Sequence, residues 1–227
     1  MNNPMDSAKT PTRRLVVIPM RGLRNGKTRL RAAFPGDWVN GLVWALAQMV
    51  IAAVVQADPV SAVALLSPDP ELLRLVAEIY PRIITLRQPN NGLNEGLDFA
   101  LDFAQREMDV QAFYTVNADI PLISSAAVRE LYHETEWRSN SCAVIAHDHY
   151  ETGVNALGLY MAPDFQFHFG PNSRMLHTQE AHMRNMQSIS LRYDAFIHDI
   201  DTIEDVIWLQ TRHAHVWRDM QRQIAHF

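Results

Sequence analysis

The stretch RLVVIPMRGLRNGKTRLR, Arg14–Arg31, contains the pattern that decides the fold. Its apolar run, Leu15–Ile18, predicts a buried strand, and a loop rich in glycine and cations follows it. The cations of this stretch beyond the strand are Arg21, Arg24, Lys27, Arg29 and Arg31. A strand that delivers basic side chains and free backbone N–H groups to one place can bind phosphate. We therefore expect a phosphate site directly after the first strand.

Three interpretations of this loop are open. A P-loop requires G-x-x-x-x-G-K-[ST], but the loop between Gly22 and Gly26 is one residue short of that spacing. Arg21 occupies the place of the first glycine, and its side chain would crowd a tight wrap of the backbone. A solvated basic surface loop is the second interpretation. The third, which we favour, is a looser loop in which long side chains hold a triphosphate.

Composition limits the class of protein. The chain has 227 residues, of which 48% are hydrophobic, and this is enough for one domain with a substantial core. The net charge of −5 and the pI near 6.0 give no indication of a nucleic-acid partner. Cys142 is the one cysteine, which excludes intrachain disulfides and Cys-rich metal sites and fits a reducing, cytoplasmic setting.

Two segments bear on the domain organisation. Residues 1–12 are polar, lack the apolar core of a signal peptide and predict a disordered tail, so that one domain spans residues 13–227. Trp38–Ala57 carries no charge and has the length of a membrane span. It contains polar residues (Asn40, Gln48 and Gln56) and has no cationic cluster at its C-terminal end. We therefore interpret it as a core helix and expect no membrane association.

Strand-like and helix-like segments alternate along the chain. The predicted strands are Leu15–Ile18, Val60–Leu66, Arg82–Leu86, Ala112–Val116, Cys142–Ala146, Ala156–Tyr160 and Ile189–Tyr193. The predicted helices, beside the core helix, are Pro70–Tyr80, Leu93–Glu107, Ser125–Glu136, Ser173–Met186 and Thr202–Ile224. This alternation is typical of an α/β fold with a mostly parallel central sheet and helices on both faces. Ligands of such folds bind beyond the carboxyl ends of the strands.

Acidic residues follow two of the predicted strands. Asp119 comes just after Val116, where the alternative interpretation is a turn or helix-capping residue. Asp199 and Asp201 are two residues apart, which in an extended segment places both carboxylates on the same side. A divalent cation offsets the repulsion between such carboxylates, and Mg²⁺ suits an all-oxygen site shared with phosphates. Thr202 and Asp205 match a capping pattern, and this role is compatible with metal binding by the two aspartates.

The remaining loops offer weaker candidates. In NNGLNEGL the residues Asn90–Gly92 are typical of a turn, and Asn94 can cap the next helix or contact a base or ribose edge. Gly170–Ser173 predicts a turn that opens a helix with Ser173 as its cap, and a helix N-terminus can bind an anion. The apolar side chains of Thr202–Ile224 favour packing on the chain's own sheet or, alternatively, a homodimer contact.

Six motifs in order along the chain resemble those of one family. They are VIPMRGLRNGKTRL, GLNEGL, NADIPL, GVNAL, FGPNSRMLH and DIDTIEDV. The chain resembles the phospholactate/phosphoenolpyruvate guanylyltransferases of deazaflavin (F-420) coenzyme biosynthesis, which are relatives of the sugar-nucleotide and molybdenum-cofactor nucleotidyltransferases. The resemblance implies a single Rossmann-like nucleotidyltransferase domain that uses GTP and Mg²⁺ to join GMP to a small phosphorylated hydroxy- or enol-acid, with release of pyrophosphate.

The resemblance also implies roles for individual residues. Nucleotide binding falls to Gly26, Lys27, Arg29 and, from its loop position, Asn94; catalysis falls to Lys27 and Asp119. The metal ligands are Asp119, Asp199 and Asp201, and the acceptor-binding residues are Arg21, Val154, Gly170 and Ser173.

Two positions depart from the family's pattern. The family usually has lysine at Arg21 and threonine at Val154, and both positions lie near the acceptor. Arginine offers a planar fork instead of a point charge, and valine lacks a hydroxyl group. The identity of the acceptor, 2-phospholactate, phosphoenolpyruvate or 3-phosphoglycerate, therefore stays open. A nucleotidyltransferase with another nucleotide or with a sugar-phosphate acceptor, and a nucleotide-binding protein without turnover, are the alternative functions.

Overall fold

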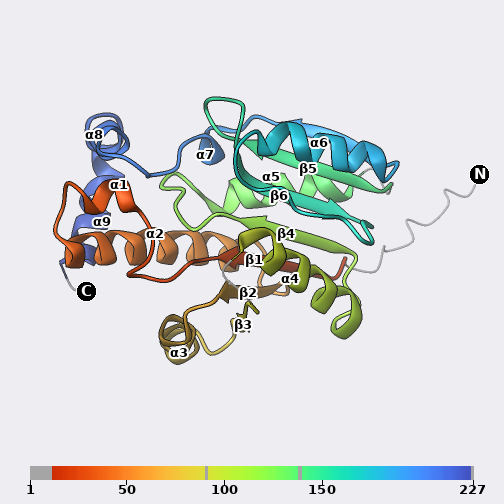
Figure 1. Cartoon of the computed structure of the whole chain (residues 1–227), viewed down its shortest axis with the longest axis horizontal. Coiled ribbons are helices and arrows are strands. Elements are labelled where there is room, and N and C mark those ends of the chain that lie inside the picture. The colour runs from red at the N-terminus through yellow and green to blue at the C-terminus, as the bar shows by residue number, and fades with distance from the viewer. Residues whose placement is uncertain (1–11, 90–91, 138–139, 226–227) are drawn as a thin grey trace, which may run out of the picture.

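A computed structural model describes residues 12–89, 92–137 and 140–225 of the chain. The predicted tail, apart from its last residue, and the turn residues Asn90 and Asn91 lie outside the described part. Between Arg14 and Ile224 the strands form one central sheet, and the helices surround it (Figure 1).

Within the described part of the chain the sheet has seven strands, in the order β3-β2-β1-β4-β6-β5-β7. Their bounds are β1 (Arg14–Pro19), β2 (Ala62–Ser67), β3 (Ile84–Arg87), β4 (Ala112–Val116), β5 (Cys142–His147), β6 (Val154–Tyr160) and β7 (Gln187–Leu191). All pairings are parallel except those of β6, which runs antiparallel to β4 and β5. The short β5–β6 connection requires this direction, because a parallel pair needs a long crossover. The predicted mostly parallel sheet is confirmed.

Four strands begin two residues away from the predicted start. β3 is Ile84–Arg87 instead of Arg82–Leu86, and β6 begins at Val154 instead of Ala156. The second strand begins at Ala62 instead of Val60, whose side chain is 82% exposed. The last strand is Gln187–Leu191 instead of Ile189–Tyr193, and every residue along it is exposed or half-buried. An edge strand buries too little apolar surface for a hydrophobic run to mark its ends.

Helices cover both faces of the sheet. They are α1 (Thr28–Arg31), α2 (Gly36–Ala57), α3 (Pro70–Ile79), α4 (Leu93–Glu107), α5 (Ser125–Glu136), α6 (Ser173–Met183), α7 (Asp194–Ile197), α8 (Ile203–Arg212) and α9 (Ala214–Ile224). Alternate residues of β1 point to opposite faces. Val16 and Ile18 pack with α2, α3, α5 and α7, whereas Leu15 and Val17 pack with α4 and α6. The α/β fold with helices on both faces is confirmed.

The helix α2 is the core helix of one face. Within the described residues it is the one helix long and apolar enough to cross a membrane by length and composition. Its buried residues run from Val39 to Ala57, and they pack against the sheet, α5 and α9. This is the packing of a helix inside the protein core, as the sequence predicts for Trp38–Ala57.

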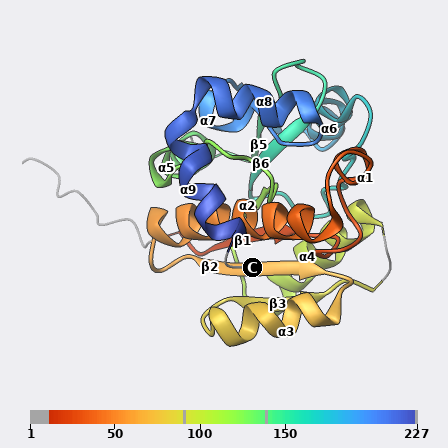
Figure 2. The same ribbon diagram turned by 90° about the vertical axis from the view of Figure 1, so that its left-hand side faces the viewer.

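The prediction of one long final helix over Thr202–Ile224 is wrong. The chain forms two helices, α8 and α9, with His213 between them at φ −133° and ψ 50°. The break turns α9 back onto α2 (Figure 2), where Trp217 and Met220 join a small core with Leu42 and Leu46. Much of the apolar surface of the two helices is therefore covered by the chain's own helix α2 instead of by the sheet.

Candidate active site

The loop after β1 turns sharply at Gly22. This glycine has φ +122°, and a Cβ atom there would lie 2.5 Å from Oδ2 of Asp69. Asp69 in turn caps α3 by accepting hydrogen bonds from the backbone N–H groups of Glu71 and Leu72. Only glycine satisfies both the backbone conformation and the close approach. The loop then ends in α1, a helix of 4 residues that begins after Lys27, which is too short for the helix that follows a P-loop.

Arg31 fixes the shape of this loop. Its guanidinium donates hydrogen bonds to the carbonyl oxygens of Gly26 (2.7 Å) and Leu23 (2.6 Å) and to Oδ1 of Asn40 (2.8 Å). The side chains of Arg21, Arg24 and Arg29 are exposed and make no hydrogen bond or ion pair with the described residues. One of the predicted cations is therefore structural, and three are available to a polyanionic ligand.

Three carboxylates meet at the carboxyl end of β4. Asp119 follows that strand, and Asp199 and Asp201 lie between α7 and α8; one oxygen from each lies within 4.8 Å of the others. The backbone holds the two segments together, because the N–H of Ile200 donates to the carbonyl of Asp119 at 3.1 Å. The predicted proximity of the three aspartates is confirmed. The predicted Thr202–Asp205 capping box is also present and begins α8 directly beside the cluster.

Lys27 lies against this cluster. Its Nζ donates to Oδ2 of Asp119 and to Oδ1 of Asp201, both at 2.5 Å. The side chain is only 11% exposed. Burial by itself would lower the pKa of Lys27, but the two carboxylates outweigh it and raise the pKa above its ordinary value. The lysine therefore keeps its positive charge and offsets part of the negative charge of the cluster.

The cluster retains capacity for a cation. Burial, and then the charges of Asp119 and Asp201, raise the pKa of Asp199 to about 7. Oδ1 of Asp119 is buried and has no hydrogen-bond partner among the described residues. Buried carboxylate oxygens without partners are costly, and a hard divalent cation satisfies several of them at once. The donor set is all oxygen, so these residues fit Mg²⁺.

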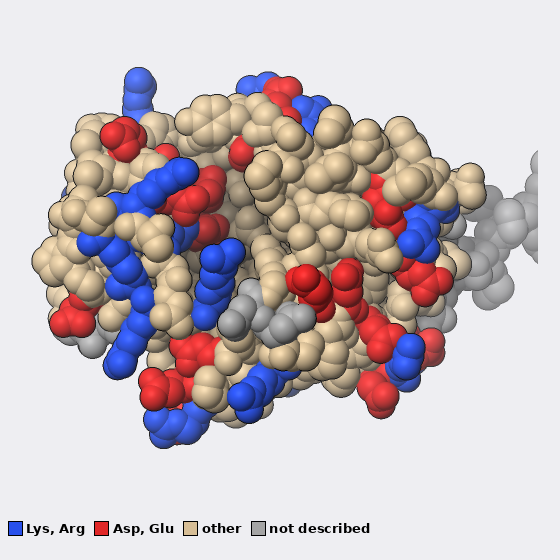
Figure 3. Space-filling model, viewed as in Figure 1, with Lys and Arg blue, Asp and Glu red and all other residues tan. Residues whose placement is uncertain are grey.

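A cleft of about 470 Å³ joins the cationic loop to the carboxylates. Figure 3 shows Lys, Arg, Asp and Glu side chains gathered around a hollow on this face. The residues that line the cleft and that the sequence analysis singled out are Arg21, Gly22, Gly26, Lys27, Arg29, Asp119 and Asp201. The fold thus brings together, in one cleft, cations from the first loop and acids from segments far along the chain.

The other predicted acceptor residues do not line this cleft. Val154 begins β6, is 4% exposed, and packs in the core of the α4–α6 face. Ser173 is 2% exposed and is the first residue of α6 instead of its cap; Asn172, with φ 60°, occupies the cap position. Gly170 has φ +127° and open space where a Cβ would be. The acceptor roles of these residues stay predictions.

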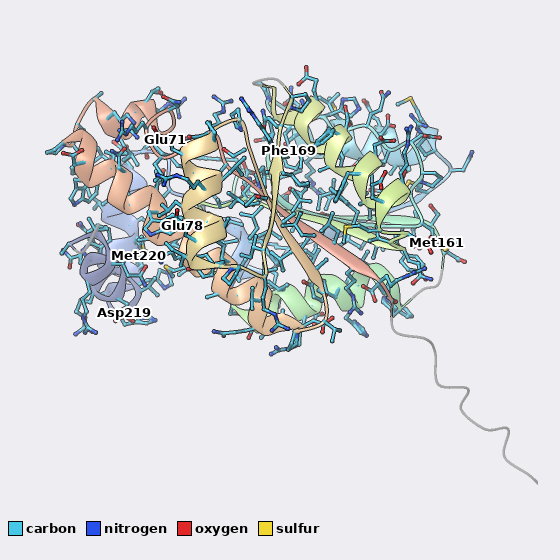
Figure 4. All side chains as sticks on the ribbon, turned by 90° about the horizontal axis from the view of Figure 1, so that it is seen from below. Glu71, Glu78, Met161, Phe169, Asp219 and Met220 are labelled. Carbon is cyan, nitrogen blue, oxygen red and sulfur yellow. The ribbon has the colours of Figure 1, made fainter. Side chains whose placement is uncertain are left out.

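Asn94 is in neither of the two predicted arrangements. It is not the cap of α4, because Gly92 occupies that position. It does not line the cleft either. Its side chain instead pairs with the backbone of Phe169, with Oδ1 accepting from the N–H at 2.7 Å and Nδ2 donating to the carbonyl at 3.1 Å. Phe169 is labelled in Figure 4 beside the N-terminal half of α4.

Comparison with known proteins decides the family. A family model described as "Guanylyl transferase CofC like" matches residues 14–214. The chain belongs to this family. The predicted family, the nucleotidyltransferase class of enzyme and the Rossmann-like fold are thereby confirmed.

Relatives and solved structures agree with the family. The phosphoenolpyruvate guanylyltransferase of Sphaerobacter thermophilus is 34% identical over 192 residues, which cover 85% of this chain and 90% of the relative. That of Rubrobacter xylanophilus is 32% identical, covering 86% and 92%. The structure of a putative nucleotide-diphospho-sugar transferase from Desulfovibrio desulfuricans has a TM-score of 0.75 at 15% identity and covers 95% of this chain and 98% of that chain. At that identity the structural likeness shows the fold alone.

Three polar residues that support the site of this guanylyltransferase are not predicted from its sequence. Gln88 and Asn117 line the cleft. Asn117 donates to the carbonyl of Val154 at 3.2 Å, and buried Asn155 donates to the carbonyl of Phe196 at 2.8 Å. These bonds connect the strand that precedes Asp119 to the segment that precedes Asp199. The position of Asn117 directly after a predicted strand could have indicated that it lies at the site, because ligands bind beyond the carboxyl ends of the strands.

Proposed function

We propose that this guanylyltransferase transfers GMP from GTP to a small phospho-acid, phosphoenolpyruvate or a close relative such as 2-phospholactate or 3-phosphoglycerate, and releases pyrophosphate. The setting would be the biosynthesis of a deazaflavin coenzyme in the cytoplasm. One observation carries the proposal: Arg21 and Arg29, which have no partner among the described residues, line one cleft together with Asp119 and Asp201 of the three-carboxylate cluster. The names of the relatives, phosphoenolpyruvate guanylyltransferases, support the choice of acceptor.

The chemistry needs charge neutralisation and alignment more than proton transfer. A phosphate monoester has a second pKa of about 6, so the phosphate of the acceptor is mostly a dianion at neutral pH and attacks without a general base. Its oxygen forms a bond to the α-phosphorus of GTP while the bond from that phosphorus to the bridging oxygen of pyrophosphate breaks. Arg21 and Arg29, which line the cleft, are suited to hold the anionic groups in line.

Asp119, Asp199 and Asp201 would hold Mg²⁺, since the cluster is all oxygen and contains a buried unpaired oxygen atom. The bound ion would supply positive charge for the α-phosphate and the acceptor. Lys27 keeps its charge at the same place and lines the cleft in which the phosphates would bind. No histidine or cysteine is required for these steps.

A pyrophosphate-release screen tests this function. GTP, ATP, CTP and UTP are each combined with phosphoenolpyruvate, 2-phospholactate, 3-phosphoglycerate and a sugar phosphate, with Mg²⁺ or with chelator. We expect release with GTP and a phospho-acid in Mg²⁺ and none in chelator. Release with another nucleotide or with the sugar phosphate alone would contradict the assigned substrates. GTP binding without pyrophosphate release from any acceptor would point to a non-catalytic nucleotide-binding protein.

A further inference from the structure

The chain segment Gln166–Phe169 is held by side chains in place of a neighbouring strand. Each of its backbone N–H groups donates to a side chain from α4 or α6. The bonds are Gln166 to Oε1 of Glu180 (3.2 Å), Phe167 to Oδ1 of Asp98 (3.2 Å), His168 to Nε2 of His177 (3.0 Å) and Phe169 to Oδ1 of Asn94 (2.7 Å). We call this set the side-chain ladder.

The ladder has a regular geometry. Successive N–H groups of an extended segment point to opposite sides. Those of Gln166 and His168 reach α6, and those of Phe167 and Phe169 reach α4. On each helix the two accepting side chains are three or four residues apart and therefore share one face. Both helices thus hold the segment from its two edges, and the next residue is Gly170.

Asn94 makes the last bond of the ladder and differs from the other three acceptors. Its amide both accepts from and donates to the backbone of Phe169, as a residue of a paired strand would. Leucine has nearly the same shape but neither polar atom, and aspartate has no donor. Leu93, the preceding residue, lines the nucleotide cleft. Asn94 therefore stands between the cleft and the loop that carries Gly170 and Ser173.

His177 acts on the same segment from α6. Its imidazole is fully buried among Phe165, Phe167 and Phe169. Burial, and then the neighbouring His168, lower the pKa of His177 to about 4. The ring is therefore neutral at physiological pH, and Nε2 is free to accept the hydrogen bond from His168. His177 lies one turn of α6 after Ser173 and couples that turn to the ladder.

We infer that Asn94 is a positioning residue for the acceptor and not a ligand of the nucleotide. It holds Phe169 so that Gly170 and Ser173 keep the conformation in which the phospho-acid binds. The inference rests on the proposed function and on the acceptor roles that the family resemblance predicts for Gly170 and Ser173, which do not line the cleft. Preorganising this corner lowers the cost of ordering it when the acceptor binds.

Steady-state kinetics of two matched variants test the inference. Asn94→Leu removes the last bond of the ladder. Gln105→Leu is the control, since Gln105 also lies on α4 and its amide also bonds a backbone carbonyl, that of Ala162 at 3.2 Å, outside the ladder. We expect Asn94→Leu to raise the KM of the acceptor by about tenfold and to change the KM of GTP by less than about twofold. The control should change neither KM. A raised KM for GTP with an unchanged KM for the acceptor would overturn the inference.

Amide hydrogen exchange gives a readout that does not depend on turnover. In Asn94→Leu the amide of Phe169 should exchange faster than in the wild type, and in Gln105→Leu it should not. Wild-type protein that releases no pyrophosphate with any acceptor would contradict the proposed function alone. In that case, the affinity of the three proteins for the same phospho-acids, measured by calorimetry, replaces the KM values. An unchanged affinity of Asn94→Leu for these phospho-acids would overturn the inference.

Discussion

At the scale of single residues, the environment of a side chain decides its role more than its type does. The basic loop after β1 contains chemically similar cations with different partners. Arg31 donates hydrogen bonds to loop carbonyls, and Lys27 pairs with carboxylates. Arg29 makes no hydrogen bond or ion pair with the described residues. Asp119 is distinctive among the acids that the structure describes, because one of its oxygens is buried and unpaired. This oxygen makes Asp119 the residue whose replacement should be most informative.

Asp119→Asn should lower kcat for pyrophosphate release by about 100-fold or more, because the amide removes a negative charge from the proposed Mg²⁺ site. Asp201→Asn should act in the same direction. Asp219→Asn is the control and should leave kcat unchanged, because Asp219 (labelled in Figure 4) has a 67% exposed side chain on α9 and does not line the cleft. The measurement is initial rate at saturating GTP over a Mg²⁺ titration. Near wild-type rates for both cluster variants would contradict the metal assignment.

At the scale of elements, the contact between α9 and α2 depends on a missing side chain. A Cβ on Gly41 would lie 3.2 Å from both Cγ2 and the carbonyl oxygen of Ile224, so a glycine lets the two helices approach closely. Gly36, at the start of the same helix, has only the flexible end of Arg31 nearby, at 3.7 Å. The same substitution can therefore be compared at a closely packed position, Gly41, and at an open position, Gly36, of one helix.

Gly41→Val should lower the free energy of unfolding by about 2 kcal/mol, because the added methyl groups force α9 away from α2. Gly36→Val should change it by less than about 0.5 kcal/mol. Urea unfolding followed by tryptophan fluorescence measures both, since Trp217 of α9 lies in this contact. Equal effects of the two substitutions would show that the α2–α9 contact contributes little to stability.

At the scale of the whole molecule, buried His177 should make stability depend on pH. Its pKa is about 4 in the folded chain and about 6.5 when unfolded, so the unfolded chain binds the extra proton between these values. The stabilising contribution is complete above about pH 6.5 and declines as the pH falls toward 4. Among the described residues, His168 and Glu180 are the titratable groups that face the ring; His168 lowers the pKa of His177 and Glu180 raises it.

Between pH 6.5 and 5 the wild type should lose about 2 kcal/mol of stability through His177. His177→Gln keeps an acceptor for the N–H of His168 but does not titrate, so its stability should fall less over the same range. Urea unfolding at several pH values measures the difference between the two proteins, in which the other titrating groups cancel. Parallel pH profiles would mean that folding does not lower the pKa of His177.

The sequence by itself determined the α/β class, the family, the strands of the central sheet and the residues of the carboxylate cluster. Strong apolar runs mark buried strands, and Asp119 comes shortly after one of them, at the edge of the sheet where ligands bind. Asp199 and Asp201 are recognisable from their spacing of two residues before a helix cap. Only the tertiary structure decided that Lys27 pairs with Asp119 and Asp201, that His213 divides the final helix, and that Asn94 holds Phe169. These outcomes depend on contacts between segments far apart in sequence, which no local spacing records.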